Sequence, residues 1–181
     1  MNTCIAFLRG INVGGKNILP MKELAALLEG LGLKDVATYL ASGNVVFRSD
    51  TNDVDRLADE IKAAIGQGHG FTPQILIRSR HDLEEAMTAN PFPEGESRPK
   101  TLHLFFLESP PADPDLESLD SIKTATERFS LLGSVFYLHA PDGIDRSKVA
   151  ARVEKLLGVT ATARNWRTVS KVMALATRTE G

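Results

Sequence analysis

The chain has 181 residues and a formal net charge of −2, so it lacks the overall positive charge that draws nucleic acids to a protein. Its single cysteine, Cys4, excludes an internal disulfide and a cysteine-rich metal site, and we interpret it as a small buried hydrophobe. Apolar runs are too short to span a membrane, and the first residues lack the pattern of a signal peptide. We therefore expect a cytoplasmic protein.

Apolar periodicity predicts a complete β-α-β-β-α-β unit in residues 1–79. Residues 3–9 are apolar on both faces until Arg9, which indicates a strand in a sheet that is covered on both sides. The other predicted elements are a helix from Pro20 to Gly30, strands at 36–41 and 45–48, a helix over 54–65 capped by Thr51 or Asn52, a loop at 67–70 and a strand at 74–78. This order is typical of a ferredoxin-like unit.

The same order recurs in residues 80–181, with a further helix at each end. Ser79 and Asp82 are expected to cap the first of these helices, which stops at Asn90-Pro91. After a polar loop at 91–100, we predict strands at 101–107, 126–131, 134–139 and 159–163 and helices at 114–121, 146–157 and 167–177. The predicted fold class is α+β, with two ferredoxin-like halves, 1–79 and 80–181, packed together as one compact unit.

Residues 10–17, which we call the glycine loop, are the first candidate for a binding site. A glycine-rich backbone before a helix can direct N–H groups, here those of Gly14 and Gly15, at a phosphate or carboxylate. Arg9 and Lys16 would add charge, and Asn12 would fix the orientation of the ligand. The spacing matches neither a P-loop nor a dinucleotide fingerprint. The alternative is a structural turn held by asparagine side chains.

The second candidate is the segment 164–171, in which cations surround the only tryptophan. Its proposed ligand-binding residues are Arg164, Asn165, Trp166 and Arg167. In the alternative interpretation, Asn165 caps a helix and Trp166 enters a core.

A third candidate is a single-stranded RNA surface on the sheet of the second half. Strand alternation places His103 and Phe105 on one side of their strand, and Tyr137 and His139 on one side of theirs. The alternative is a sheet face covered by other elements. The four histidines are scattered, so no metal site, cofactor or reaction is predicted.

Four motifs follow one another along the chain: FLRGINVGGKN from Phe7, YLASGNVVF from Tyr39, Asn90-Pro91-Phe92, and RNWRTV from Arg164. In these motifs the chain resembles the bacterial family called domain of unknown function 1697. The resemblance implies a small α+β protein with ferredoxin-like elements and no assigned activity.

From these observations we predict that the protein binds a small anionic ligand, bearing a phosphate or carboxylate, at the glycine loop. The alternatives are a single-stranded RNA-binding module and a protein-interaction module in which the glycine loop is purely structural. We expect the first and third strands to be parallel, which would separate the glycine loop from the Ser42-Gly43-Asn44 turn. That turn is then mainly structural, and residues 164–171 approach the glycine loop.

Overall fold

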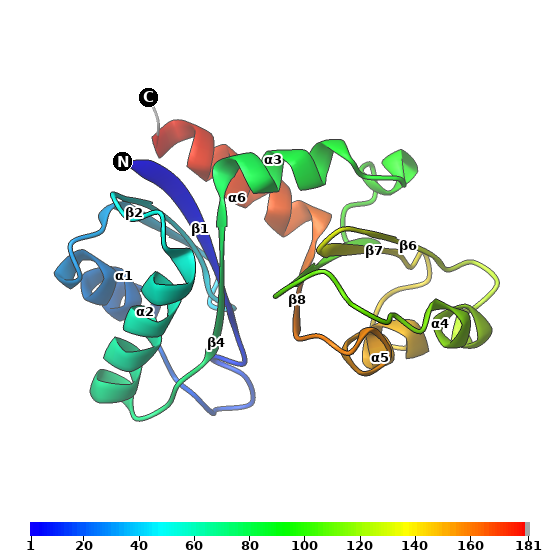
Figure 1. Ribbon diagram of the computed structural model, residues 1–181, viewed down its shortest axis with the longest axis horizontal. Coiled ribbons are helices and arrows are strands. Elements are labelled where there is room, and N and C mark those ends of the chain that lie inside the picture. Colours follow the sequence, from blue (N-terminus) through cyan, green and yellow to red (C-terminus); the bar gives the residue numbers. More distant parts are fainter. Residues whose placement is uncertain (180–181) are drawn as a thin grey trace. The chain divides into compact units, whose positions relative to one another are not determined.

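The structure, a computed structural model, describes residues 1–179 and divides into two compact units (Figure 1). The first unit comprises Met1–Glu85 and the C-terminal segment from Ser170, and the second comprises Ala86–Val169. The divisions fall within the helices α3 (Arg80–Thr88) and α6 (Trp166–Thr179).

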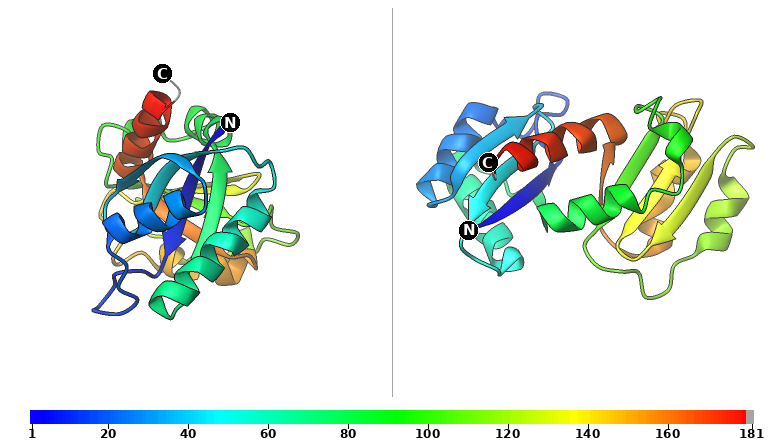
Figure 2. Two further views of the ribbon diagram at one scale, coloured as in Figure 1. Left: turned by 90° about the vertical axis from the view of Figure 1, so that its left-hand side faces the viewer. Right: turned by 90° about the horizontal axis from the view of Figure 1, so that it is seen from above.

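The first unit contains a four-stranded antiparallel sheet in the order β2-β3-β1-β4. Its elements are β1 (Asn2–Arg9), α1 (Met21–Gly30), β2 (Lys34–Tyr39), β3 (Asn44–Ser49), α2 (Val54–His69) and β4 (Gln74–Ser79). In the left view of Figure 2, α1 and α2 lie together on one face of the sheet. Their apolar stripes bury one side of β1, including Cys4, which confirms Cys4 as a core hydrophobe.

The other side of β1 is buried too, because Ile5 and Phe7 are as inaccessible to solvent as Ala6 and Leu8. The strand therefore belongs to a sheet covered on both faces, as its continuous apolar run predicts.

The predicted strand directions in this unit were wrong. β1 and β3 are antiparallel neighbours, with Phe7 opposite Asn44, whereas β1 and β2 are parallel and separated by β3. This is the split βαβ arrangement, in which a hairpin inserts its second strand beside β1. The end of β1 and the start of β3 therefore lie at the same edge of the sheet.

The second unit repeats this arrangement with strand order β6-β7-β5-β8. Its elements are a short 3-10 helix η1 (Pro93–Gly95), β5 (Leu102–Leu107), α4 (Leu116–Ile122), β6 (Arg128–Leu132), β7 (Val135–His139), α5 (Lys148–Leu157) and β8 (Ala161–Asn165). α4 and α5 cover one face of this sheet and close a core around Phe105, Phe136 and Val153 (Figure 1). Two antiparallel sheets with their helices confirm the α+β class.

The ends of the helices show how well local sequence signals predict where a helix begins and ends. Ser79 and Asp82 form the predicted reciprocal cap, with each backbone N–H donating to the other side chain over 3.0 Å. Two details of α2 differ from the prediction: Asp53 caps it rather than Thr51 or Asn52, and the helix continues through the predicted loop to His69. Gly70, with φ of 78°, ends the helix because its left-handed backbone suits glycine.

Within residues 1–179, no helix has both the length and the apolar character needed to cross a membrane.

Candidate functional site

The glycine loop folds into a miniature hairpin. The N–H of Lys16 donates to the carbonyl of Val13 over 3.0 Å, and the N–H of Asn12 donates to the carbonyl of Asn17 over 3.0 Å. Gly14 and Gly15 both have positive φ, 57° and 73°, which together with the Lys16 bond defines a type I′ turn.

Asparagine side chains hold this hairpin in place. The Nδ2 group of Asn12 donates to the carbonyls of Leu19 and Ala41, over 2.9 and 2.8 Å, while its Oδ1 accepts from the N–H of Leu19 over 2.8 Å. Asn17 donates to the carbonyl of Gly10 over 2.9 Å. Both N–H bonds of the Asn12 amide are therefore used inside the fold, as the alternative structural interpretation predicts.

The Ser42-Gly43-Asn44 turn meets the glycine loop directly, contrary to the predicted separation. The N–H of Leu8 donates to the carbonyl of Gly43 over 2.8 Å, at the edge where β1 ends and β3 begins. Gly43 has φ of 90°, and a Cβ there would lie 2.7 Å from the Cβ of Leu8 and 2.8 Å from the Cδ1 of Ile11. Only glycine allows the turn and β1 to approach so closely.

The hydrogen-bond donors and the cation that the glycine loop leaves accessible to a ligand lie at its tip. The N–H groups of Gly14 and Gly15 donate no hydrogen bond within residues 1–179, and the Lys16 side chain is exposed. Arg9 is exposed at the end of β1.

The segment 164–167 joins β8 to α6, and most of its side chains are buried or hydrogen-bonded within the fold. Asn165 caps α6 by accepting from the N–H of Thr168 over 2.9 Å, and Trp166 is only 8% exposed. Arg164 donates to the carbonyl of Ala163 over 2.9 Å, and burial lowers the pKa of Arg164 to about 10. Arg167 alone of the four is exposed.

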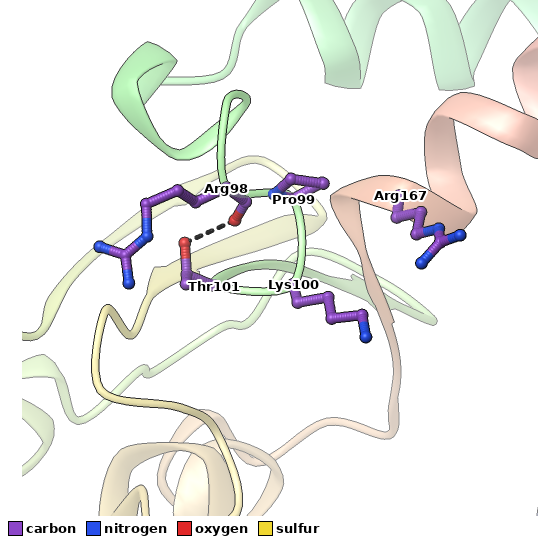
Figure 3. Close-up of a pocket in the computed structure, with 5 residues that line it drawn as sticks. All are labelled: Arg98, Pro99, Lys100, Thr101 and Arg167. Carbon is purple, nitrogen blue, oxygen red and sulfur yellow. Dashed lines mark hydrogen bonds between the residues drawn. The ribbon is translucent and has the colours of Figure 1, made fainter.

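Arg167 lines a pocket of about 390 Å³ within the second unit. The other lining residues are Arg98, Pro99, Lys100 and Thr101 (Figure 3). The pocket exists because β5 and β8 are antiparallel, with His103 opposite Asn165, so the residues before β5 lie beside those after β8. Three of the five lining residues are cations and none is an acid.

The cations do not all point the same way. Figure 3 shows the side chains of Lys100 and Arg167 extending to the same side of the 98–101 turn, whereas the Arg98 guanidinium points away from them. Arg98 donates to the carbonyl of Pro141 over 3.2 Å. The turn itself is closed by Thr101, whose hydroxyl and N–H both donate to the Arg98 carbonyl, over 2.7 and 2.8 Å.

Sequence reasoning missed Arg98 and Lys100 because it placed them in an ordinary polar loop. The available signal was a pair of cations around a proline immediately before a strongly apolar strand. Their partner Arg167 is more than 60 residues away in sequence, so only the pairing of β5 with β8 reveals the cluster.

The predicted RNA-stacking surface is wrong. Tyr137 pairs with Leu104 and His139 with Leu102, so Tyr137 and His139 lie on the opposite face of the sheet from His103 and Phe105. Tyr137 is also buried and donates its hydroxyl to the carbonyl of Ala86 over 2.6 Å. An RNA partner is therefore not supported.

The buried histidines have structural surroundings. His103 is 8% exposed, and burial lowers its pKa to about 4, against a smaller opposing effect of Asp145. His139 stacks on Phe92 with ring centroids 6.1 Å apart, and Arg128 lies 5.0 Å from the centroid of the same Phe92 ring. Among residues 1–179 no cluster of three metal-ligating side chains occurs.

Comparison with known proteins agrees with this fold. A family model described as "Protein of unknown function (DUF1697)" matches residues 1–137. The chain belongs to the DUF1697 family. This confirms the resemblance found in the sequence, and the matched region contains three of the four motifs.

A solved structure, that of the conserved bacterial protein SP0830 from Streptococcus pneumoniae, is similar to this chain with a TM-score of 0.71 and 25% sequence identity. The alignment covers 97% of this chain and 98% of the pneumococcal one. A search of curated proteins finds no match. The chain is thus an uncharacterised bacterial protein of the DUF1697 family.

Proposed function

We propose that this DUF1697 protein binds a small ligand bearing a phosphate or carboxylate, and that Lys100 and Arg167 bind the anionic group. The observation that supports this proposal is the pocket itself: it lies within one unit, no acid lines it, and the Lys100 and Arg167 side chains extend to the same side of the 98–101 turn (Figure 3). A volume of about 390 Å³ falls within the range of pockets that hold small molecules.

The two cations would bind the anionic group in different ways. The Arg167 guanidinium can donate two parallel hydrogen bonds to two oxygens of one anion, whereas the Lys100 ammonium acts as a point charge. Arg167 is the second residue of α6, so the positive end of this helix dipole lies beside the pocket and favours an anion further. The ring of Pro99 gives an apolar wall for the uncharged part of the ligand.

The other predicted binding residues enter this proposal differently. Asn165 and Trp166 would hold α6 in position rather than contact the ligand, because the fold already occupies their side chains. Anion binding at the tip of the glycine loop, the approach of residues 164–171 to that loop and a cytoplasmic location stay predictions. No reaction is proposed.

Titration calorimetry of the whole chain with inorganic phosphate, a sugar phosphate and citrate tests the proposal. Loss of one charged hydrogen-bonding partner costs about 1.5–3 kcal/mol, so we expect Arg167→Ala and Lys100→Ala each to weaken binding by roughly 10- to 100-fold. Arg152→Ala, which removes an exposed cation from α5 in the same unit, is the matched control and should bind normally. Absence of saturable binding, or equal affinities for Arg167→Ala and Arg152→Ala, would contradict the proposal.

A further inference from the structure

We infer that the glycine loop and the neighbouring turn at residues 40–43 form a docking surface for a protein segment that carries an apolar side chain next to a carboxylate. We call this surface the loop corner; its residues are Val13, Gly14, Gly15, Lys16, Ile18 and Leu40. The inference is independent of the pocket proposed above, whose residues lie in the other unit.

The loop corner exposes apolar side chains that an isolated fold would be expected to bury. Val13 is 65% exposed, Ile18 55% and Leu40 53%, while Ile11 and Leu19 in the same stretch are almost fully buried. The two segments are tied to each other by the hydrogen bond from Asn12 to Ala41. Exposed aliphatic side chains on two segments that are tied together are the kind of feature from which an interaction site on a soluble protein is inferred.

The loop corner is also held rigid before any partner arrives. Five residues between 10 and 17 have positive φ: Gly10, Asn12, Gly14, Gly15 and Asn17. Glycine and asparagine adopt this backbone readily, and here the Asn12 and Asn17 side chains and the type I′ turn hold it in place. A preorganised surface pays little entropy on binding, which favours a recognition role over a passive connection.

Charge identifies the chemistry of the partner. Residues 9–20 contain two cations, Arg9 and Lys16, and no acid, and residues 39–45 carry no charge, although the whole chain has a net charge of −2. The Gly14 and Gly15 N–H groups, which lack acceptors within residues 1–179, add hydrogen-bond donors beside Lys16. A carboxylate satisfies these groups.

The apolar side chains distinguish a protein from other anions. A free carboxylate would leave Val13, Ile18 and Leu40 exposed. A nucleic-acid strand would need more cations and an aromatic stacking surface, and residues 10–18 contain no aromatic residue. A protein segment with an aliphatic or aromatic side chain beside Asp or Glu complements both the exposed apolar side chains of the loop corner and its Lys16 and N–H donors.

Selection of a phage-displayed random peptide library on the whole chain tests this inference. We expect enriched peptides that combine an apolar residue with a neighbouring Asp or Glu, and whose binding, measured by fluorescence anisotropy, falls at least roughly 10-fold in Val13→Asp and in Lys16→Glu. Leu31→Asp is the matched control, because Leu31 is a 40%-exposed leucine of the same unit outside the loop corner. Circular dichroism establishes that all three variants fold.

Charge exchange gives a second readout. A peptide whose carboxylate is replaced by lysine should lose affinity for the natural chain and regain it for Lys16→Glu. Lys100→Ala should leave peptide binding unchanged, so failure of the pocket proposal and of this one can be told apart. The inference is overturned if no peptide is enriched, if Val13→Asp and Leu31→Asp bind equally, or if an oligouridylate or free acetate binds the loop corner instead.

Discussion

The side-chain amide of Asn12 donates to the main-chain carbonyl of Ala41 over 2.8 Å, although 29 residues separate them in sequence. This bond joins the glycine loop to the turn that opens β3. It ties together two segments that the antiparallel pairing of β1 with β3 places at one edge of the sheet.

Removal of the Asn12 side chain should loosen this surface. Asn12→Ala deletes three hydrogen bonds, whereas Asn17→Ala deletes one; the two residues have nearly equal positive φ, 54° and 52°, so the backbone cost of alanine is matched. At about 0.5–1.5 kcal/mol per bond, we expect Asn12→Ala to lower the free energy of unfolding by about 1–3 kcal/mol more than Asn17→Ala. Urea denaturation measures this difference, and equal losses would show that the Asn12 bonds do not stabilise the fold.

Gly43 should tolerate no side chain. Gly43→Ala combines a positive φ with a Cβ only 2.7 Å from the Cβ of Leu8, so we expect a loss of about 2–4 kcal/mol. Gly14→Ala also has a positive φ but meets no atom within 4 Å, and should cost only about 1 kcal/mol. Thermal unfolding of the two variants separates the steric effect from the backbone effect. A Gly43→Ala protein as stable as Gly14→Ala would mean that β1 and the turn can move apart freely.

Acidification should destabilise the second unit through His103. Its folded-state pKa is lowered to about 4 from an ordinary 6.5, so between these values the unfolded chain takes up a proton that the folded chain does not. Stability is therefore present above pH 6.5 and is lost as pH falls toward 4, by about 2 kcal/mol between pH 7 and 5.

His103→Gln removes this proton uptake while keeping a polar side chain, and urea denaturation at both pH values should show a smaller pH dependence. Part of the dependence will remain, because burial and the neighbouring Arg128 and Arg98 also lower the pKa of His139. An unchanged pH dependence in His103→Gln would contradict the assignment.

The Tyr137 hydroxyl should contribute to the stability of the second unit. It donates to the carbonyl of Ala86, which lies in the last turn of α3, where carbonyls lack partners within the helix. Tyr137→Phe removes this buried hydrogen bond, and we expect the free energy of unfolding to fall by about 1–2 kcal/mol. Tyr39→Phe, at a half-buried position on β2, should change stability little in the same urea titration. Equal effects would exclude a specific role for the Ala86 bond.

Local signals were enough to predict most helices and strands. The continuous apolar run of β1, the stripe of α5 and the Ser79–Asp82 cap each depend on residues within a few positions of one another. The errors arose where the determinant is not local. Gly68 and Gly70 suggested a loop at 67–70, yet the helix continues through Gly68 to His69 and ends only at Gly70.

The site was harder to predict because it depends on which strands pair and in which register. A shift of one residue between β5 and β7 would place Phe105 beside Tyr137, and the actual register places them on opposite faces. Likewise, Lys100 and Arg167 come together only through the pairing of β5 with β8. Composition drew attention to cations and glycines but carried no information about the distances between them.

The central position of β1 has a consequence for biosynthesis. β1 has both edges covered only after its partner β4 has been synthesised, because residues 10–73 separate the two strands. At about 5–20 residues per second, synthesis from the end of β1 to the end of β4 takes roughly 4–14 s. For that time the apolar segment Cys4–Leu8 lacks this partner. An uncovered apolar strand invites pairing with other nascent chains. Chaperone supply during translation is therefore expected to govern how much of this protein reaches its native state.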